Sequence, residues 1–140
     1  MCAYNNKKGY DGEVECAEFL QDIFTDDLVV RFGGVEFNKT THSGDVGIIQ
    51  SKKKFNKLEK AQRPITESPL YDVFIEVKKQ ASPNVWKDYK KACDDAKHAN
   101  KQHVFLYTIK QKRGEKGERL VCMSPETFEY FMVNRLDIHI

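Results

Sequence analysis

The feature that most constrains the fold is the segment DVFIEVK in the middle of the chain. Aliphatic residues occupy every second position in it, at Val73, Ile75 and Val77. A period of two is the pattern of a β-strand that buries one face. Glu76 and Lys78 therefore project together from the other face, about 6–7 Å apart. Because one strand cannot form a core alone, the chain must supply further strands and covering helices.

The rest of the chain alternates between helical and strand periodicity. Asp11 is a plausible N-cap after Gly9, and residues 50–69 contain two prolines and no clear apolar period, which predicts an inserted loop or arm. We predict these elements in chain order: helix 13–24, strands 28–32, 45–49 and 72–78, helix 84–100, strands 103–109 and 119–123, and a last helix capped by Ser124. This order indicates a single α/β domain of 140 residues, with a mixed sheet flanked by helices.

Composition excludes several classes of protein. The net charge of +2 is too small to indicate nucleic-acid binding without a local concentration of charge. The four cysteines are far apart and form no C-x-x-C pair, which favours reduced thiols in an intracellular, cytoplasmic protein. No apolar run approaches the roughly 18 residues of a membrane span, so we expect no membrane association.

Two further carboxylates stand at unusual positions. Asp45 opens a short apolar strand after a Ser-Gly turn, and Gly47 lies on its side of that strand, which leaves space for a metal ion or a phosphate. Glu13 heads the apolar stripe of the first helix, whereas Glu15 and Glu18 fall on its polar side. A carboxylate directed at a core is costly unless it is paired or binds a metal.

Each feature taken alone has a plainer explanation. Glu76 and Lys78 can form a charged solvent face of an edge strand, since such pairs are common and weakly stabilising. Asp45 can be a turn aspartate. Glu13 can be a favourable charge in the first turn of a helix, although this does not explain its place on the buried face.

Taken together and in order, the motifs resemble those of a known family. The chain has GxxxE ending at Glu13, SGD ending at Asp45, and IEVK containing Glu76 and Lys78. This arrangement resembles the archaeal-type Holliday junction resolvases of the PD-(D/E)XK nuclease superfamily, over residues 7 to about 110. The chain departs from the family pattern in having Gly44, not proline, before the aspartate, and in the longer gap between the aspartate and the E-x-K pair.

The resemblance implies a restriction-endonuclease-like αβββαβ core and a set of catalytic residues, Glu13, Asp45, Glu76 and Lys78. Asp45 and Glu76 would bind Mg²⁺, with Mn²⁺ as a substitute, and the carbonyl of Val77 and the carboxylate of Glu13 would complete the shell directly or through water. Such an ion polarises phosphoryl oxygens and activates water. Lys78 would orient the attacking water or neutralise the charge that develops.

Basic residues are concentrated in the predicted arm. Between Lys52 and Arg63 there are six basic residues and one acid, a composition that suits contacts with the DNA backbone or a merely solvated loop. We assign DNA contacts to six lysines: Lys7, Lys8, Lys52, Lys53, Lys54 and Lys79.

Other residues are assigned to structure. Trp86 stands near the start of an amphipathic helix and is expected in the core, whereas Tyr10 and Phe55 are candidates for base stacking. The histidines lack zinc-site spacing. Asp72 lies about 13 Å along the strand from Glu76, too far to share one ion, and can have a hydrogen-bonding role.

The leading hypothesis is a metal-dependent, structure-selective DNA endonuclease, a junction resolvase acting as a symmetric homodimer on branched DNA. A restriction-type or DNA-processing endonuclease is the nearest alternative. A non-catalytic DNA-binding module on the same fold is a third, disfavoured because carboxylates facing phosphate do not help a binder.

Overall fold

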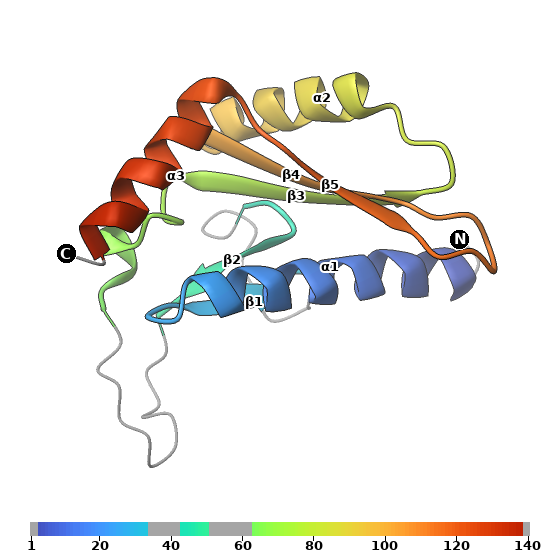
Figure 1. Ribbon diagram of the computed structural model, residues 1–140, viewed down its shortest axis with the longest axis horizontal. Helices are drawn as coiled ribbons and strands as arrows, with labels where there is room; N and C mark the ends of the chain where they lie inside the picture. The colour runs from blue at the N-terminus through green and yellow to red at the C-terminus, as the bar shows by residue number, and fades with distance from the viewer. Residues whose placement is uncertain (1–2, 34–42, 51–62, 139–140) are drawn as a thin grey trace, which may run out of the picture.

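The computed structural model describes residues 3–33, 43–50 and 63–138, with only the backbone described at 3–8 and 135–138. It shows an α/β fold in which three helices flank a five-stranded mixed sheet, so the predicted fold class and element order are confirmed (Figure 1). The elements are α1 (Ala3–Ile23), β1 (Leu28–Arg31), β2 (Val46–Ile49), a 3₁₀ turn η1 (Ile65–Glu67), β3 (Val73–Gln80), α2 (Val85–His98), β4 (His103–Lys110), β5 (Glu118–Cys122) and α3 (Pro125–Ile138).

The strands lie in the order β1-β2-β3-β4-β5, which places β3 at the centre of the sheet. The pair β3–β4 is parallel and the other three pairs are antiparallel. β3 and β4 are in register along their whole length, but β2 meets β3 at one register pair, Val46↔Ile75. β2 therefore diverges from β3, and the two strands form a fork. Among the described residues, the second half of β3 has a register partner only in β4.

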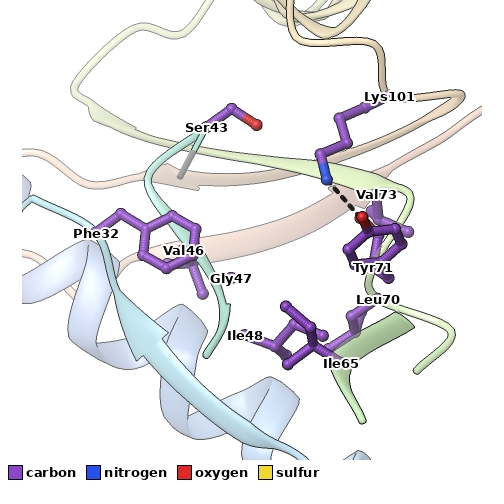
Figure 2. Close-up of a pocket in the computed structure, with 10 residues that line it drawn as sticks. All are labelled: Phe32, Ser43, Val46, Gly47, Ile48, Ile65, Leu70, Tyr71, Val73 and Lys101. Carbon is purple, nitrogen blue, oxygen red and sulfur yellow. Dashed lines mark hydrogen bonds between the residues drawn. The ribbon is translucent and has the colours of Figure 1, made fainter. Parts of the chain in front are cut away.

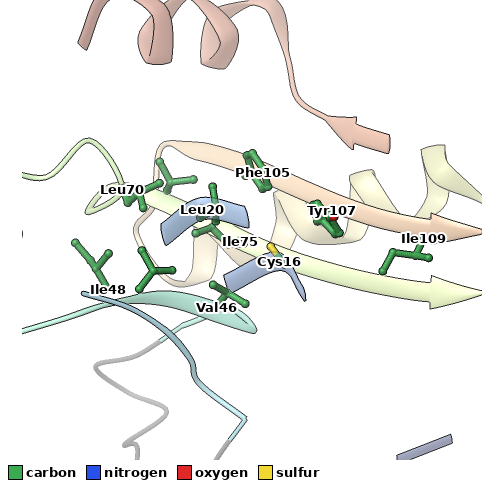
Figure 3. Close-up of a cluster of buried hydrophobic side chains, with 11 residues drawn as sticks. Cys16, Leu20, Val46, Ile48, Leu70, Ile75, Phe105, Tyr107 and Ile109 are labelled. Carbon is green, nitrogen blue, oxygen red and sulfur yellow. The ribbon is translucent and has the colours of Figure 1, made fainter. Parts of the chain in front are cut away.

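One face of the sheet carries the main core (Figure 3). Cys16 and Leu20 of α1 pack there against Ile75 of β3, and all three are almost completely buried. α3 closes the same core, since the ring of Phe131 packs near that of Phe105. The apolar stripe predicted for the first helix is thus confirmed.

The other face is covered by α2. Ala92 packs there against Phe74 and Val104, as the helical periodicity predicted. Since side chains alternate along a strand, Glu76 and Lys78 lie on the same face as Phe74. The E-x-K pair therefore belongs to the central strand of the sheet, in the half of that strand that has no register pair with β2.

Two glycines expected before the first helix lie inside it. α1 begins at Ala3 and runs through Gly9 and Gly12, so Asp11 is not an N-cap. A Cβ at Gly12 would lie 3.3 Å from Cγ1 of Val77, which shows how closely α1 approaches β3. Continuous helical hydrogen bonding and this close packing outweigh the cost of about 1 kcal/mol for a helical glycine.

The end of the predicted arm is packed onto the domain. The guanidinium of Arg63 binds both carboxylate oxygens of Asp27, at 2.8 and 2.7 Å, and the hydroxyl of Ser68 donates to the same carboxylate. Leu70 enters the main core. Arg63 is thus a structural residue and not part of a DNA-binding arm. Lys52, Lys53 and Lys54 lie outside the described residues.

The prediction that Trp86 lies in the core is wrong. Trp86 is 82% exposed, because it lies about 100° around α2 from Val85, off the face that packs on the sheet. The predicted cap of the last helix is confirmed, since the hydroxyl of Ser124 accepts a hydrogen bond from the amide of Thr127 at 3.1 Å. No helix in the described part of the chain is long and apolar enough to cross a membrane.

The Asp27–Arg63 pair yields a stability prediction. Arg63→Ala leaves a carboxylate whose side chain is 3% exposed without its guanidinium, and breaking a buried pair in this way costs about 3 kcal/mol or more. Urea unfolding should show this loss. Arg119→Ala, which breaks the far more exposed pair with Glu15, is the matched control and should cost under about 1 kcal/mol. Equal losses in both variants would show that burial does not govern the contribution of these pairs.

Candidate active site

The site is built around Asp45, which lies where β2 leaves β3. Its backbone amide donates to the carbonyl of Ile75 at 2.9 Å, and its carbonyl accepts from the amide of Phe32 at 2.8 Å. Its carboxylate accepts from the amide of Val77 at 2.9 Å. The backbone of Asp45 thus bonds to Ile75 of β3, and its side chain bonds to Val77, two residues further along the same strand.

The preceding glycine makes this arrangement possible. Gly44 has φ +86°, and a Cβ there would lie 2.7 Å from the carbonyl oxygen of Ile75. Other residues rarely adopt this conformation, and the approach to β3 excludes a side chain. This turn therefore needs a glycine at position 44.

Glu76 meets Asp45 across the fork. Extending the antiparallel register from Val46↔Ile75 by one residue places the two acids opposite each other. Burial, the hydrogen bond to Asp45 and the charge of Asp45 raise the pKa of Glu76 to about 9, against an opposing effect of Lys78. The two carboxyl groups therefore hold one proton between them near neutral pH.

The two consecutive lysines of β3 are on opposite faces. Lys78 projects on the α2 face, as Glu76 does, and its charge acts on the Glu76 carboxyl. Lys79 lies on the α1 face, since a Cβ added at Gly12 of α1 would be 3.6 Å from the Cβ of Lys79. The hydrogen bond from Arg119 is the main cause that lowers the pKa of Glu15, and the charge of Lys79 adds to it. The predicted opposition of Lys78 and Lys79 is confirmed.

Glu13 reaches the fork from α1. Its side chain is 14% exposed, and its pKa is raised by burial first and then by the charge of Asp45. Sequence reasoning missed its partner, Arg31, whose Nε lies 3.3 Å from a Glu13 carboxylate oxygen. The Arg31 guanidinium also lies 4.6 Å from the centre of the Tyr10 ring. The sequence gives one indication of this ion pair: Arg31 is the charged residue that ends the otherwise apolar strand β1.

These residues have the donor chemistry of a magnesium site with few protein ligands. Mg²⁺ is commonly held by one or two carboxylates, with waters and substrate phosphates in its remaining positions. Asp45 and Glu76 supply two adjacent carboxyl groups. The Val77 amide points at Asp45, and the carbonyl of a strand residue faces the same neighbour as its amide. Within residues 3–33, 43–50 and 63–138, no three acidic, histidine or cysteine side chains form a metal-binding group. Glu13 is paired with Arg31, and its place in a metal shell stays a prediction.

The space expected beside Gly47 is filled. A Cβ at Gly47 would overlap the ring of Phe32, and Figure 2 shows this ring beside Val46 and Gly47. The adjoining cavity, of about 60 Å³, is too small for a nucleotide. The prediction that Gly47 admits a metal ion or a phosphate is therefore wrong, because the glycine accommodates an aromatic ring.

Glu15 is partly exposed, on the polar side of the helix as predicted, but its carboxylate has partners that the sequence did not predict. Arg119 donates two hydrogen bonds to its carboxylate, at 2.9 and 2.7 Å, and the Tyr107 hydroxyl donates a third at 2.6 Å. These long side chains come from β4 and β5 and reach over the flank of α1. Glu18 is exposed, as predicted.

The remaining predictions are placed as follows. Lys7 and Lys8 fall in α1, in the part whose side chains are not described. Asp72 accepts a hydrogen bond from the amide of Gln102, which confirms a hydrogen-bonding role. His103 contacts the hydroxyl of Thr127 and stacks on Tyr130.

Comparison with protein-family models, with curated proteins and with solved structures gives no significant match. The function proposed below therefore rests on the residues of the site and on its sequence motifs.

The shared proton yields a pH prediction. Because the pKa of Glu76 is about 9 in the folded protein and about 4.5 in the unfolded chain, the folded state binds this proton more tightly. The free energy of unfolding should therefore fall as the pH rises from about 5 to 9 in the absence of divalent cations. Glu76→Gln keeps a hydrogen-bond donor for Asp45 and should lose much of this decline.

Urea unfolding at several pH values with a chelator tests this, with Glu18→Gln as the exposed control. A decline as steep in Glu76→Gln as in the wild type would contradict the shared proton. Added Mg²⁺ should stabilise the wild type more as the pH rises, because the ion competes with the proton for the same oxygens.

Proposed function

We propose that the protein is a metal-dependent endonuclease that hydrolyses phosphodiester bonds in DNA, on a restriction-endonuclease-like αβββαβ core. The observation that carries the proposal is the pairing of the Asp45 and Glu76 carboxyl groups at the fork of a central sheet, with Lys78 on the same face as Glu76. Two acids that lie side by side repel each other when both are ionised, and a structural ion pair with Lys78 would need only one of them.

The acids and the lysine have separate roles in this proposal. Asp45 is fixed through three hydrogen bonds, two to β3 and one to Phe32, which follows β1, so its free oxygen has a defined position. Glu76 gives up the shared proton when the pair binds a divalent cation. A bound Mg²⁺ would polarise the phosphoryl oxygens and assist deprotonation of the attacking water. Lys78 stabilises negative charge that develops on those oxygens.

Glu13 and Arg31 support the site from the α1 side. Their ion pair places a carboxylate near Asp45 while compensating its charge. Loss of either side chain would change the electrostatic environment of Asp45. Glu13 is thus assigned a supporting role that does not depend on direct contact with the metal.

Branched DNA is the proposed substrate, because the motif order resembles that of junction resolvases. Lys52, Lys53 and Lys54 follow β2 in sequence, so we propose that they bind the DNA backbone beside the site. Paired incisions at a junction require two sites, and we propose a symmetric homodimer. Light scattering gives the mass of the assembly, and a monomer that does not dimerise on DNA would contradict this proposal.

The acidic pair yields the first activity prediction. Asp45→Asn and Glu76→Gln should each abolish Mg²⁺-dependent cleavage and leave DNA affinity nearly unchanged, because they remove ligand charge and not phosphate contacts. Labelled four-way junctions, flaps, duplexes and single strands should be compared as substrates. Glu18→Gln is the control and should cleave at the wild-type rate. Wild-type cleavage by both site variants would refute the assignment.

The lysine pair separates a nuclease from a binding module. Lys78→Ala should lower the cleavage rate at saturating DNA by about a hundredfold or more, comparable to the loss of one preorganised donor at an oxyanion. Lys79→Ala, one residue on but on the α1 face, is the matched control and should leave the rate largely unchanged. Equal small losses of affinity in both variants, with no Mg²⁺-dependent product from any substrate, would favour a DNA-binding module.

A further inference from the structure

A second cavity, of about 330 Å³, lies on the α2 face of the sheet, away from the fork. Pro83 and Val85 line it from the segment that begins α2, and Thr108, Lys110 and Leu120 line it from β4 and β5. The predicted site residues do not include any of these five. Its volume is in the range of small-ligand sites, unlike that of the cavity beside Phe32.

Thr108 and Leu120 form the sheet side of this cavity. Thr108 is 2% exposed, and its hydroxyl oxygen is covered. Thr108 projects toward the α2 face, as does Leu120, its register partner on β5. Because this oxygen is covered, a ligand in the cavity would meet the surrounding walls and not the Thr108 hydroxyl.

The walls combine apolar side chains with one positively charged and one negatively charged side chain. Pro83, Val85 and Leu120 are apolar, and Lys110 lies opposite Glu118 across β4 and β5. A lone phosphate would leave the apolar walls unused and would meet the Glu118 carboxylate. A nucleobase has apolar faces and an edge of mixed donors and acceptors, so it suits these walls better. Trp86, which follows Val85 in the chain, is highly exposed and does not line the cavity.

The cavity adjoins the candidate active site through Lys78. In the parallel pair β3–β4, Thr108 is the register partner of Lys78, and both project on the α2 face. Neighbouring strands are about 4.8 Å apart, so β5 lies roughly 10 Å from β3. This is within reach of a nucleotide adjacent to the one whose phosphate lies at Asp45 and Glu76.

We propose that this cavity binds an unpaired nucleobase of the DNA substrate, next to the phosphodiester bond that is cleaved. The proposal rests on the proposed nuclease function for its choice of substrate. It accounts for selectivity toward DNA structure, because a base in uninterrupted duplex must first be unstacked and unpaired to enter a pocket. Flaps, bulges and branch points offer such a base at lower cost.

Binding is tested first, without metal or cleavage. The protein can be titrated with thymidine 5′-monophosphate by isothermal titration calorimetry in the presence of a chelator. Leu120→Tyr fills the cavity and should weaken binding at least tenfold. Val121→Tyr, on the opposite face of the same exposed strand, is the matched control and should bind as the wild type does.

Thr108→Val, which keeps the shape of the side chain and removes a hydroxyl that is covered from the cavity, is a second control and should bind as the wild type does. Inorganic phosphate at the same concentrations should not compete. No binding of the nucleotide by the wild type, equal binding by the Leu120 and Val121 variants, or full competition by phosphate would each overturn the nucleobase assignment.

Cleavage is tested second, with Mg²⁺ and two duplexes that differ by one unpaired nucleotide. The wild type and Val121→Tyr should cleave the bulged duplex at least tenfold faster than the paired one, and Leu120→Tyr should lose this preference. Nucleotide binding that depends on Leu120, without cleavage of any substrate, would support the cavity and overturn the nuclease. Cleavage without nucleotide binding, and with the same preference in Leu120→Tyr, would overturn the cavity alone.

Discussion

The hydrogen bond from the Val77 amide to the Asp45 carboxylate is the interaction on which the site depends. It joins β2 to β3 just beyond their single register pair, with a side chain in the position where a strand would present a carbonyl. Asp45 is held beside Glu76, and the second half of β3 keeps an edge that β2 does not cover.

The two faces of the sheet bring different chemistry to this edge. α1 carries Glu13, whose charge Arg31 compensates, while the α2 face carries Glu76 and Lys78. Asp45 lies between them and raises the pKa of both glutamates. Burial and mutual repulsion make the acids unfavourable as a fully ionised set, and either a proton or a divalent cation relieves that repulsion. The same groups therefore link stability, pH and metal binding.

The packing of α2 on the sheet determines where a ligand can enter this face. Small side chains, such as Ala92 and Ala96, allow α2 to pack tightly on Phe74 and Val104. Toward its start the helix meets Thr108 and Leu120 less closely, and the cavity remains there. One helix thus seals the end of the face that forms the core and leaves open the end that adjoins Lys78. The proposed substrate contact and the proposed chemistry share this arrangement.

The sequence by itself determined the features that depend on local periodicity and on caps. Alternation along the central strand assigned Glu76 and Lys78 to one face and Lys79 to the other, and the helical period placed Glu13 with Cys16 and Leu20. These assignments hold because the geometry of a strand or a helix depends only on a residue and its near neighbours.

Only the tertiary structure decided which distant groups meet. Glu15 binds Arg119, which is 104 residues away in sequence, and Gly47 accommodates the ring of Phe32. Trp86 is exposed because the packing of α2 on the sheet selects one of its faces. The partner of a side chain on a flank or at a fork depends on how whole elements pack, and a local pattern carries no information about an element far along the chain.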